Sequence, residues 1–263
     1  MGLPEEDTAE AGQATSRESR AQLRQMLVIG VVASVLGIAL GLVIDWFPVQ
    51  ASGEAKPIDT MWDVLIIASV PVFVLTQTIV LYSVWKFRMK PGEELKDGPP
   101  IHGNTQLEVV WTAIPAILLV GLCTYAYIVL TDIEKADASP EQMNVRVVGE
   151  QFTWTFFYPG EGGELASPEL YLPIDTQVTF AVQSKDVIHD FFVPAFREKV
   201  DAVPGITTNY DVNTRRVGDY PVVCAELCGL GHSTMRQTAH VVPRPQFDQW
   251  LADQRARAAE AAE

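Results

Sequence analysis

Three apolar stretches that contain no Asp, Glu, Lys or Arg constrain the fold of this 263-residue chain more than any other feature. They cover residues 27–44, 64–85 and 109–130. The second and third are 22 residues long. As helices each extends about 33 Å, enough to cross a hydrocarbon core of about 30 Å. A helix buried in a soluble core rarely runs this long without a charge. These two stretches therefore predict transmembrane helices over residues 61–87 and 108–131.

The first apolar stretch has two interpretations. It follows three basic residues, as the hydrophobic part of an export signal does: Arg17, Arg20 and Arg24. Val49-Gln-Ala51 also resembles a cleavage site of small residues. The apolar core is, however, longer than the about 7–15 residues of a usual signal. We predict an export signal or a signal-anchor helix over residues 26–51, and both cleavage and retention as a third span stay open.

Basic residues decide the predicted topology. The loop over residues 88–107, together with the helix end before it, carries four of them: Lys86, Arg88, Lys90 and Lys96. Short loops rich in Lys and Arg stay in the cytoplasm, so the chain after residue 131 emerges on the other side. A retained first helix that starts inside gives the same result, because three crossings also end outside.

The exported part is acidic. Residues 131–263 contain 20 Asp or Glu and 11 Lys or Arg. This balance disfavours nucleic acid as a partner and suits a basic protein that is steered by charge. An ordinary solvated surface explains the same composition, so the choice of partner depends on the site.

The exported part also carries a β pattern. From Met143 onward, short β-branched or aromatic runs alternate with Pro-Gly and Gly-Gly turns, at residues 145–148, 152–158, 177–182, 207–212 and 239–242. Closely spaced short strands of this kind predict a sandwich or small barrel over residues 140–244. Residues 245–263 begin with Pro and predict a C-terminal helix and tail. At the other end, residues 1–25 are polar and acidic, and we expect them to be disordered.

One short segment gathers metal ligands. Cys224, Cys228, His232 and Met235 lie within twelve residues, and His189 lies upstream. Thiolate and thioether are soft ligands and imidazole suits copper, so this set indicates copper before calcium or magnesium. Two Cys, two His and one Met exceed what a single blue-copper ion uses, which suggests a binuclear centre. A disulfide between the two Cys is the alternative in an exported domain, but the accompanying His and Met favour metal. No C-x-x-C-H stretch occurs, so we expect no covalently attached haem.

The spacing of these residues resembles a known family. Cys224–Met235 meets C-x-E-x-C-G-x-x-H-x-x-M at every fixed position, and Asp186-Val-Ile-His189, Lys199–Gly205 and Leu107–Pro115 match further segments. Together with the two predicted spans, they resemble subunit II of the haem–copper oxidases, in the copper-bearing cytochrome c oxidase branch, over roughly residues 59–250. The resemblance implies a transmembrane helical hairpin, a cupredoxin-like Greek-key barrel or sandwich, and a short C-terminal helix. It also implies a bacterial plasma membrane, with the copper domain on the extracytoplasmic side.

The resemblance further implies a ligand set. A dinuclear copper A centre would be held by six residues: His189, Cys224, Glu226, Cys228, His232 and Met235. Both thiolates would bridge the two ions. One ion would also take His189 and the Met235 thioether, and the other His232 and the backbone carbonyl of Glu226. The Glu226 carboxylate would reach a magnesium ion shared with subunit I, which suits a hard oxygen ligand.

Three more residues receive roles from the resemblance. Glu108, three residues before Trp111, would stand at the mouth of a proton channel into subunit I, although an acid there also serves as an interfacial anchor. The family's G-x-Q-W-x-W run reads Gly149-Glu-Gln-Phe152-Thr-Trp154 here. Phe152 and Trp154 are thus candidates for receiving the electron, and an aromatic core residue is the alternative for each. Phe lacks an indole N–H and ionises less readily, so the route or the donor can differ from the family's.

The combined interpretation is the electron-accepting subunit of a proton-pumping aa3/caa3-type cytochrome c oxidase. Its partners would be the haem-bearing subunit I, subunit III, membrane lipid and a cytochrome c that docks on acidic residues such as Asp186. This chain itself would bind no haem and no nucleic acid. A quinol oxidase-like subunit II shares the architecture but does not need the copper ligands. A membrane-anchored copper-binding or copper-delivery protein would need open, exchangeable ligands. A nitrous oxide reductase would need a further catalytic domain.

Overall fold

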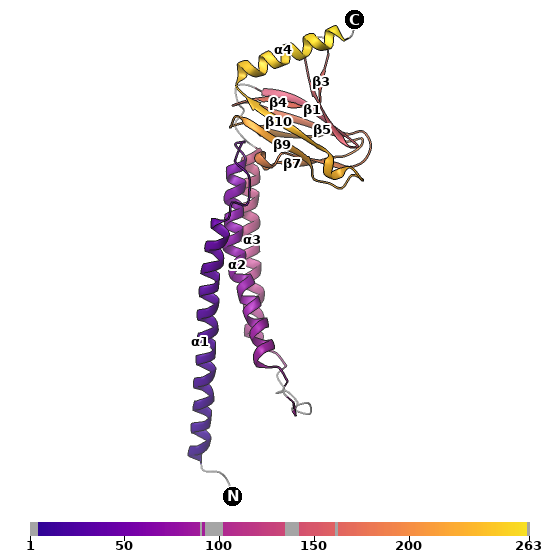
Figure 1. Cartoon of the computed structure of the whole chain (residues 1–263). Coiled ribbons are helices and arrows are strands. Elements are labelled where there is room, and N and C mark those ends of the chain that lie inside the picture. The colour runs from indigo at the N-terminus through magenta and orange to yellow at the C-terminus, as the bar shows by residue number, and fades with distance from the viewer. Residues whose placement is uncertain (1–4, 90, 93–101, 135–141, 161–162, 262–263) are drawn as a thin grey trace. The chain divides into compact units, whose positions relative to one another are not determined.

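A computed structural model describes residues 5–89, 91–92, 102–134, 142–160 and 163–261, with side chains from residue 20 onward (Figure 1). The chain forms two compact units. The first consists of Met1–Asp45 and Trp62–Leu122, and the second of Trp46–Met61 and Cys123–Glu263.

The first unit contains most of three long helices: α1 (Glu5–Val43), α2 (Ala55–Lys86) and α3 (Thr105–Glu134). Residues 55–61 of α2 and 123–134 of α3 belong to the second unit. Each helix contains a stretch long and apolar enough to cross a membrane, and most of the large apolar side chains on these stretches are exposed. Apolar residues on the outside are expected where lipid is the solvent. The two predicted transmembrane helices are therefore confirmed. Residues 90 and 93–101 of the predicted loop lie outside the described residues.

Helix α1 differs from the expectation at its start. It begins at Glu5, within the stretch 1–25 for which the polar composition predicted disorder. The residues of this stretch include many Glu, Ala, Gln and Arg, which have high helix propensity, so polarity does not prevent a helix here.

Two glycines bring α1 close to α2. A Cβ atom added at Gly37 would lie 2.9 Å from Val70 Cγ1, and one added at Gly41 would lie 2.7 Å from Ile66 Cγ2. The two glycines are four residues apart and therefore share one face of α1. Small residues at this spacing allow membrane helices to approach closely. The helix thus packs on α2 as a membrane span does.

The second unit contains two five-stranded sheets. One has the order β3 (Leu165–Ser167), β2 (Thr153–Tyr158), β1 (Gln142–Glu150), β5 (Gln177–Ser184) and β8 (Thr208–Asn213). The other has the order β4 (Leu170–Pro173), β10 (Arg236–Val242), β9 (Gly218–Cys224), β6 (His189–Phe192) and β7 (Lys199–Ala202). The pairs β1–β5 and β4–β10 are parallel, and the others are antiparallel. The predicted β-sandwich is confirmed.

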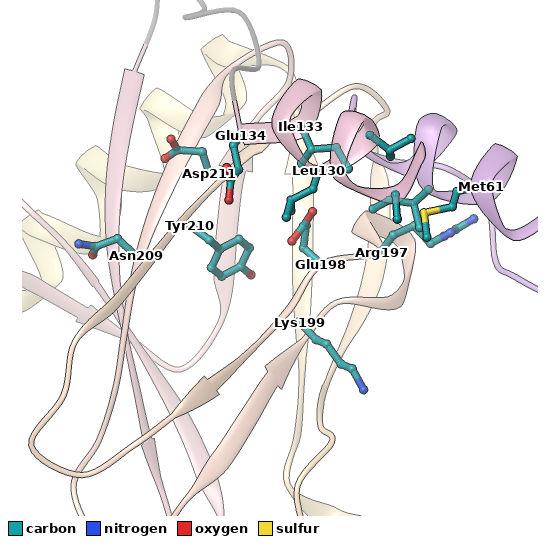
Figure 2. Close-up of a pocket in the computed structure, with 13 residues that line it drawn as sticks. Met61, Leu130, Ile133, Glu134, Arg197, Glu198, Lys199, Asn209, Tyr210 and Asp211 are labelled. Carbon is teal, nitrogen blue, oxygen red and sulfur yellow. The ribbon is translucent and has the colours of Figure 1, made fainter. Parts of the chain in front are cut away.

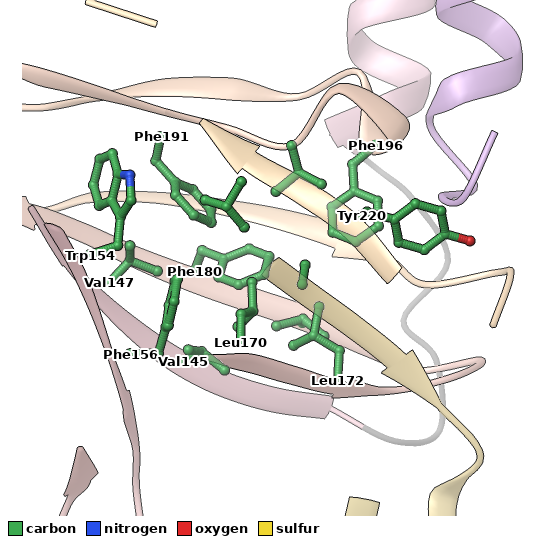
Figure 3. Close-up of a cluster of buried hydrophobic side chains, with 14 of the residues drawn as sticks. Val145, Val147, Trp154, Phe156, Leu170, Leu172, Phe180, Phe191, Phe196 and Tyr220 are labelled. Carbon is green, nitrogen blue, oxygen red and sulfur yellow. The ribbon is translucent and has the colours of Figure 1, made fainter. Parts of the chain in front are cut away.

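Aromatic residues fill the space between the sheets (Figure 3). Phe191 on β6 has Trp154 at 5.4 Å, Phe180 at 5.5 Å and Phe156 at 6.2 Å between ring centroids, and all four side chains are fully buried. Strand β5 shows why the chain folds this way, because its buried and partly exposed residues largely alternate, as the two faces of a strand require. The core therefore continues directly from Phe191 to His189 on the same strand.

The C-terminal helix α4 (Arg244–Glu260) covers β4 and β3, and it confirms the predicted helix (Figure 1). Trp250 stacks on Tyr171 at 4.3 Å and meets the Tyr158 ring edge-on at 5.1 Å. The Tyr158 hydroxyl accepts from the Tyr171 backbone N–H at 2.7 Å and donates to its carbonyl at 3.1 Å. This aromatic cluster closes the end of the sandwich.

The segment between α1 and α2 is part of the second unit. Ala51 is fully buried, donates its N–H to the Ala195 carbonyl at 2.9 Å and accepts from Arg215 N at 2.8 Å. The buried Glu54 carboxylate accepts from the Asn213 side-chain amide at 2.9 Å and from the Asn213 backbone N–H. We call residues 46–61, which include the first residues of α2, the linker strap, because they are bonded into the sheet domain on several sides.

Candidate metal centre

The metal-binding motif lies where three neighbouring strands end or begin. β6 begins at His189, β9 ends at Cys224, and β10 begins directly after Met235. These strands belong to one sheet, in which Phe191 pairs with Cys224 and Val223 with Arg236. The chain between β9 and β10 folds back as a loop containing a 3-10 turn at His232–Thr234. Strand pairing therefore brings the distant His189 to the loop.

The donor atoms lie within a few ångströms of one another. The Sγ atoms of Cys224 and Cys228 are 3.9 Å apart. Cys224 Sγ lies 3.9 Å from His189 Nδ1 and 3.2 Å from the Glu226 carbonyl oxygen. Cys228 Sγ lies 3.7 Å from His232 Nδ1 and 3.9 Å from Met235 Sδ. The structure thus brings together all six predicted ligand groups, with the two thiols in the middle.

The donors are also sheltered. His189 and Met235 are fully buried, and Cys224 and Cys228 are 8% and 5% exposed. Burial, and next to it the neighbouring Cys224, raises the pKa of the Cys228 thiol to about 11. A metal that binds thiolate must displace this proton. Two thiols, two imidazoles and a thioether fit copper, so the residues present suit the metal that the motif predicts.

Asp186 orients one imidazole. Its Oδ1 lies 2.9 Å from His189 Nε2, while the backbone N–H groups of Gln151 and Val187 donate to the same carboxylate at 2.7 Å. Burial would raise the pKa of Asp186, but these hydrogen bonds outweigh it and lower the pKa to about 2. An ionised Asp186 places the ring proton on Nε2 and leaves Nδ1 free to face Cys224. The residue itself is exposed, and these hydrogen bonds fix its carboxylate against His189.

Gly149 provides space for the same imidazole, which the sequence motif did not explain. A Cβ atom at this position would lie 2.9 Å from Trp154 Cζ3 and 3.0 Å from His189 Cδ2. Any other residue would therefore push on the ligand ring. The neighbouring Gln151 donates from Nε2 to the Cys228 carbonyl at 2.6 Å, which joins the β1–β2 turn to the metal-binding loop. In the sequence, this packing is indicated by the glycine itself, the first residue of the Gly149–Trp154 run.

Phe152 and Trp154 occupy different depths. Trp154 is fully buried, and its ring meets His189 edge-on at 5.9 Å. Its indole nitrogen has no hydrogen-bond partner within the described residues. Phe152 is partly buried, and a Cβ atom at Gly231 would lie 2.5 Å from its ring. Phe152 therefore lies on the outside of the loop, while Trp154 lies behind the ligand.

Two predicted roles concern carboxylates outside the donor cluster. Glu226 turns its carbonyl toward Cys224, and its side chain is exposed. Glu108 lies in the first turn of α3, where its Oε1 accepts from Asn104 N at 3.2 Å and Asn104 Oδ1 accepts from Leu107 N at 3.1 Å. This reciprocal pair caps the helix. Helix capping explains an acid at this position without excluding a proton-channel role.

The comparisons with known proteins agree with these observations. The family model described as cytochrome C oxidase subunit II, transmembrane domain, matches residues 28–129, and that of its periplasmic domain matches residues 164–242. Cytochrome c oxidase subunit 2 of Synechocystis sp. is 30% identical, and the alignment covers 86% of this chain and 81% of that protein. The protein of the same name from Thermostichus vulcanus is 31% identical, with coverages of 85% and 83%.

A solved structure is similar to part of this chain. The periplasmic domain of subunit II of cytochrome oxidase from Bradyrhizobium japonicum is 27% identical with a TM-score of 0.42, covering 48% of this chain and 98% of that one. The family matches span most of the two units and include the segments that place the donor cluster. The chain belongs to the cytochrome c oxidase subunit II family.

Proposed function

We propose that this chain is the electron-accepting subunit of an aa3/caa3-type cytochrome c oxidase, and that its six donor groups hold a dinuclear copper A centre. The observation that carries the proposal is the approach of both thiols to each other, with one imidazole beside each. When bound at these donors, copper would supply one-electron redox chemistry. The electrons would come from a cytochrome c and pass to haem in subunit I, where oxygen is reduced to water and protons are pumped.

The protein's part is to hold the donors in one geometry. His189 and Met235 are fully buried, and the two Cys are nearly so, which keeps water from the site. The sheet supports both ends of the loop, and Asp186 and Gly149 determine the position of His189. A closed cage of this kind suits electron transfer better than copper delivery, which requires exchangeable ligands.

The depths of the two aromatic residues support an order for electron input. Phe152 covers the loop from the outside and is the residue of the pair that a donor can contact. Trp154 lies behind it against His189 and is fully buried. We therefore propose Phe152 as an apolar contact for the donor and Trp154 as a support for the ligand.

The remaining roles concern the partner subunits. The exposed Glu226 side chain is free to reach a magnesium ion at a contact with subunit I. Glu108 would receive protons at the opposite, cytoplasmic end of α3, and subunit III would complete the complex. The spans anchor the chain in the membrane, and the basic loop supports an extracytoplasmic copper domain in a bacterial plasma membrane.

Replacement of the copper ligands tests the proposal. In the purified oxidase we expect two copper ions on this chain and a near-infrared absorption that appears on oxidation by oxygen. Cys224→Ser or His232→Ala should abolish that absorption and turnover with cytochrome c, because each removes a central donor. His240→Ala is the matched control, because His240 pairs with Asp219 and contacts none of the donors.

Three results would contradict the assignment. Normal cytochrome c turnover in Cys224→Ser would show that electrons do not pass through this loop. A single copper ion without near-infrared absorption would favour a membrane-anchored copper-binding protein. Turnover with quinol alone would favour the quinol oxidase-like alternative.

A further inference from the structure

A second site lies at the C-terminal end of α3. A pocket of about 560 Å³ opens there, and all of its lining residues belong to the second unit (Figure 2). One wall is apolar and is formed by the last turns of α3 and the end of the linker strap: Val129, Leu130, Ile133, Ile58 and Met61. Because α3 is a membrane span, this wall lies where the chain leaves the bilayer.

Two polar groups in the pocket have no partner. The Glu198 carboxylate makes no hydrogen bond or ion pair within the described residues, and it points toward Leu130 in Figure 2. The Tyr210 hydroxyl is buried and likewise has no hydrogen-bond partner among them. Burial, followed by the nearby carboxylates of Glu198 and Asp190, raises the pKa of Tyr210 well above its usual value. Unpartnered polar groups in such positions are costly unless a ligand pairs them.

The charges of the pocket select a cation. Glu134 and Asp211 line it beside Glu198, and the buried Glu54 lies close enough to act on Glu198. Arg197 also lines it, but its guanidinium is bound to Asp59 at 2.7 Å and to the carbonyls of Pro48 and Pro194. The Lys199 ammonium points away from Glu198 in Figure 2. Asp211 accepts from the Thr179 hydroxyl, so the carboxylates that an anionic head group would meet without a facing cation are those of Glu198 and Glu134.

We propose that this pocket binds the head of a phospholipid with a primary ammonium group, a phosphatidylethanolamine. The ammonium donates hydrogen bonds to the Glu198 carboxylate, and the Tyr210 hydroxyl donates to a phosphate or ester oxygen of the same head group. An acyl chain would run along Leu130 and Ile133, which line the apolar wall. A lipid fits better than a basic side chain of a partner subunit, because the apolar wall is continuous with the surface of a membrane span. The proposal does not depend on copper.

Lipid retention in the full complex tests this site. The oxidase is purified in detergent from its own membranes, and the phosphatidylethanolamine retained per chain is measured by mass spectrometry. Glu198→Gln keeps the shape of the side chain but removes its charge, so retention should fall about tenfold or more. Tyr210→Phe removes one hydrogen bond and should cause a smaller loss. Glu260→Gln, on the exposed end of α4, is the matched control and should retain the wild-type amount.

A second measurement separates recognition of the head group from non-specific coverage of the apolar wall by any lipid. In nanodiscs, wild type should unfold at a higher temperature in phosphatidylethanolamine than in phosphatidylcholine, whose trimethylammonium has no N–H to donate. The difference should vanish in Glu198→Gln. Equal unfolding temperatures of the wild type in the two lipids would overturn the proposal. So would an unchanged amount of retained phosphatidylethanolamine in Glu198→Gln. So would loss of the partner subunit from Glu198→Gln in both lipids, which would identify a basic side chain as the occupant. Copper content, measured in parallel, shows separately whether the proposed function fails.

Discussion

The behaviour of individual carboxylates in this chain depends on their hydrogen-bond partners and their burial. The sequence suggested Asp186 as one of the acidic residues on which a cytochrome c would dock, and the structure shows hydrogen bonds that hold its carboxylate against His189 and the adjoining backbone. Its effect on the metal is therefore indirect. It determines which ring nitrogen carries the proton and how firmly the ring is held.

Asp186→Asn tests this positioning role. The amide can still accept from Nε2, but the negative charge that favours the Nε2–H tautomer is lost. We expect copper affinity to fall about 10- to 100-fold and the reduction potential to rise, because an anion near the metal is removed. Asp219→Asn is the control, since it alters an equivalent Asp–His contact at His240, which binds no metal in the proposal. Competition with a copper chelator measures the affinity, and an equal loss in both variants would refute the role.

Glu198 illustrates the opposite case, a carboxylate without a hydrogen-bond or ion-pair partner in the part of the chain that the structure describes. Burial, and then the Glu54 carboxylate, raise its pKa from 4.5 to about 7. The folded state therefore binds this proton more tightly than the unfolded state, and stability from this group falls as the pH rises from about 4.5 to about 7. The charged groups that face it are Glu54, Glu134, Asp211 and Arg197, with the Tyr210 phenol.

Unfolding measurements across this pH range test the linkage. In detergent without amine lipid, Glu198→Gln should lose less stability than wild type as the pH rises, and it should be the more stable protein at pH values above about 7. Denaturant midpoints of both proteins at each pH give the difference. Parallel curves for the two proteins would show that Glu198 keeps an ordinary pKa.

At the scale of elements, α1 and the linker strap bear on whether the first helix is retained. Gly37 and Gly41 bring α1 against α2, which a cleaved signal does not need. A cut after Ala51 would create a charged ammonium at Ser52, which is 5% exposed, bridges to Thr214 and donates its hydroxyl to the Phe196 carbonyl. Burying such a charge is costly. Both observations favour retention of α1 as a third span.

The mass of the purified chain decides between the two. We expect a mass that includes α1, and the same mass for Val49→Asp, which would block cleavage at a small-residue site while changing an exposed side chain. A wild-type chain that begins at Ser52, together with a longer Val49→Asp chain, would prove that α1 is a processed signal.

At the scale of the whole molecule, the sequence predicted what depends on local pattern. The length of the stretches without charged residues predicted the membrane spans. The spacing of the metal-binding motif identified residues whose donor groups the structure brings together. The sequence did not predict the helix at residues 5–25, because composition describes solubility better than helix propensity. The roles of Gly149 and Asp186 and the pocket around Glu198 depend on contacts between residues far apart in the chain. Such contacts leave no spacing pattern in a single sequence.

The linker strap has a consequence for the order in which the molecule is assembled. Glu54 is bonded to Asn213, 159 positions later in the chain. The strap is synthesised before its partner strand β8, so its contacts with β8 must wait for α2, α3 and most of the sheet domain. Contacts at such separation form late in folding. The metal-binding loop follows β8 in the chain. The strap can therefore bond to β8 at about the time when the last of the predicted metal ligands is synthesised. The attachment of the strap and the completion of the donor cluster therefore fall close together in the order of synthesis.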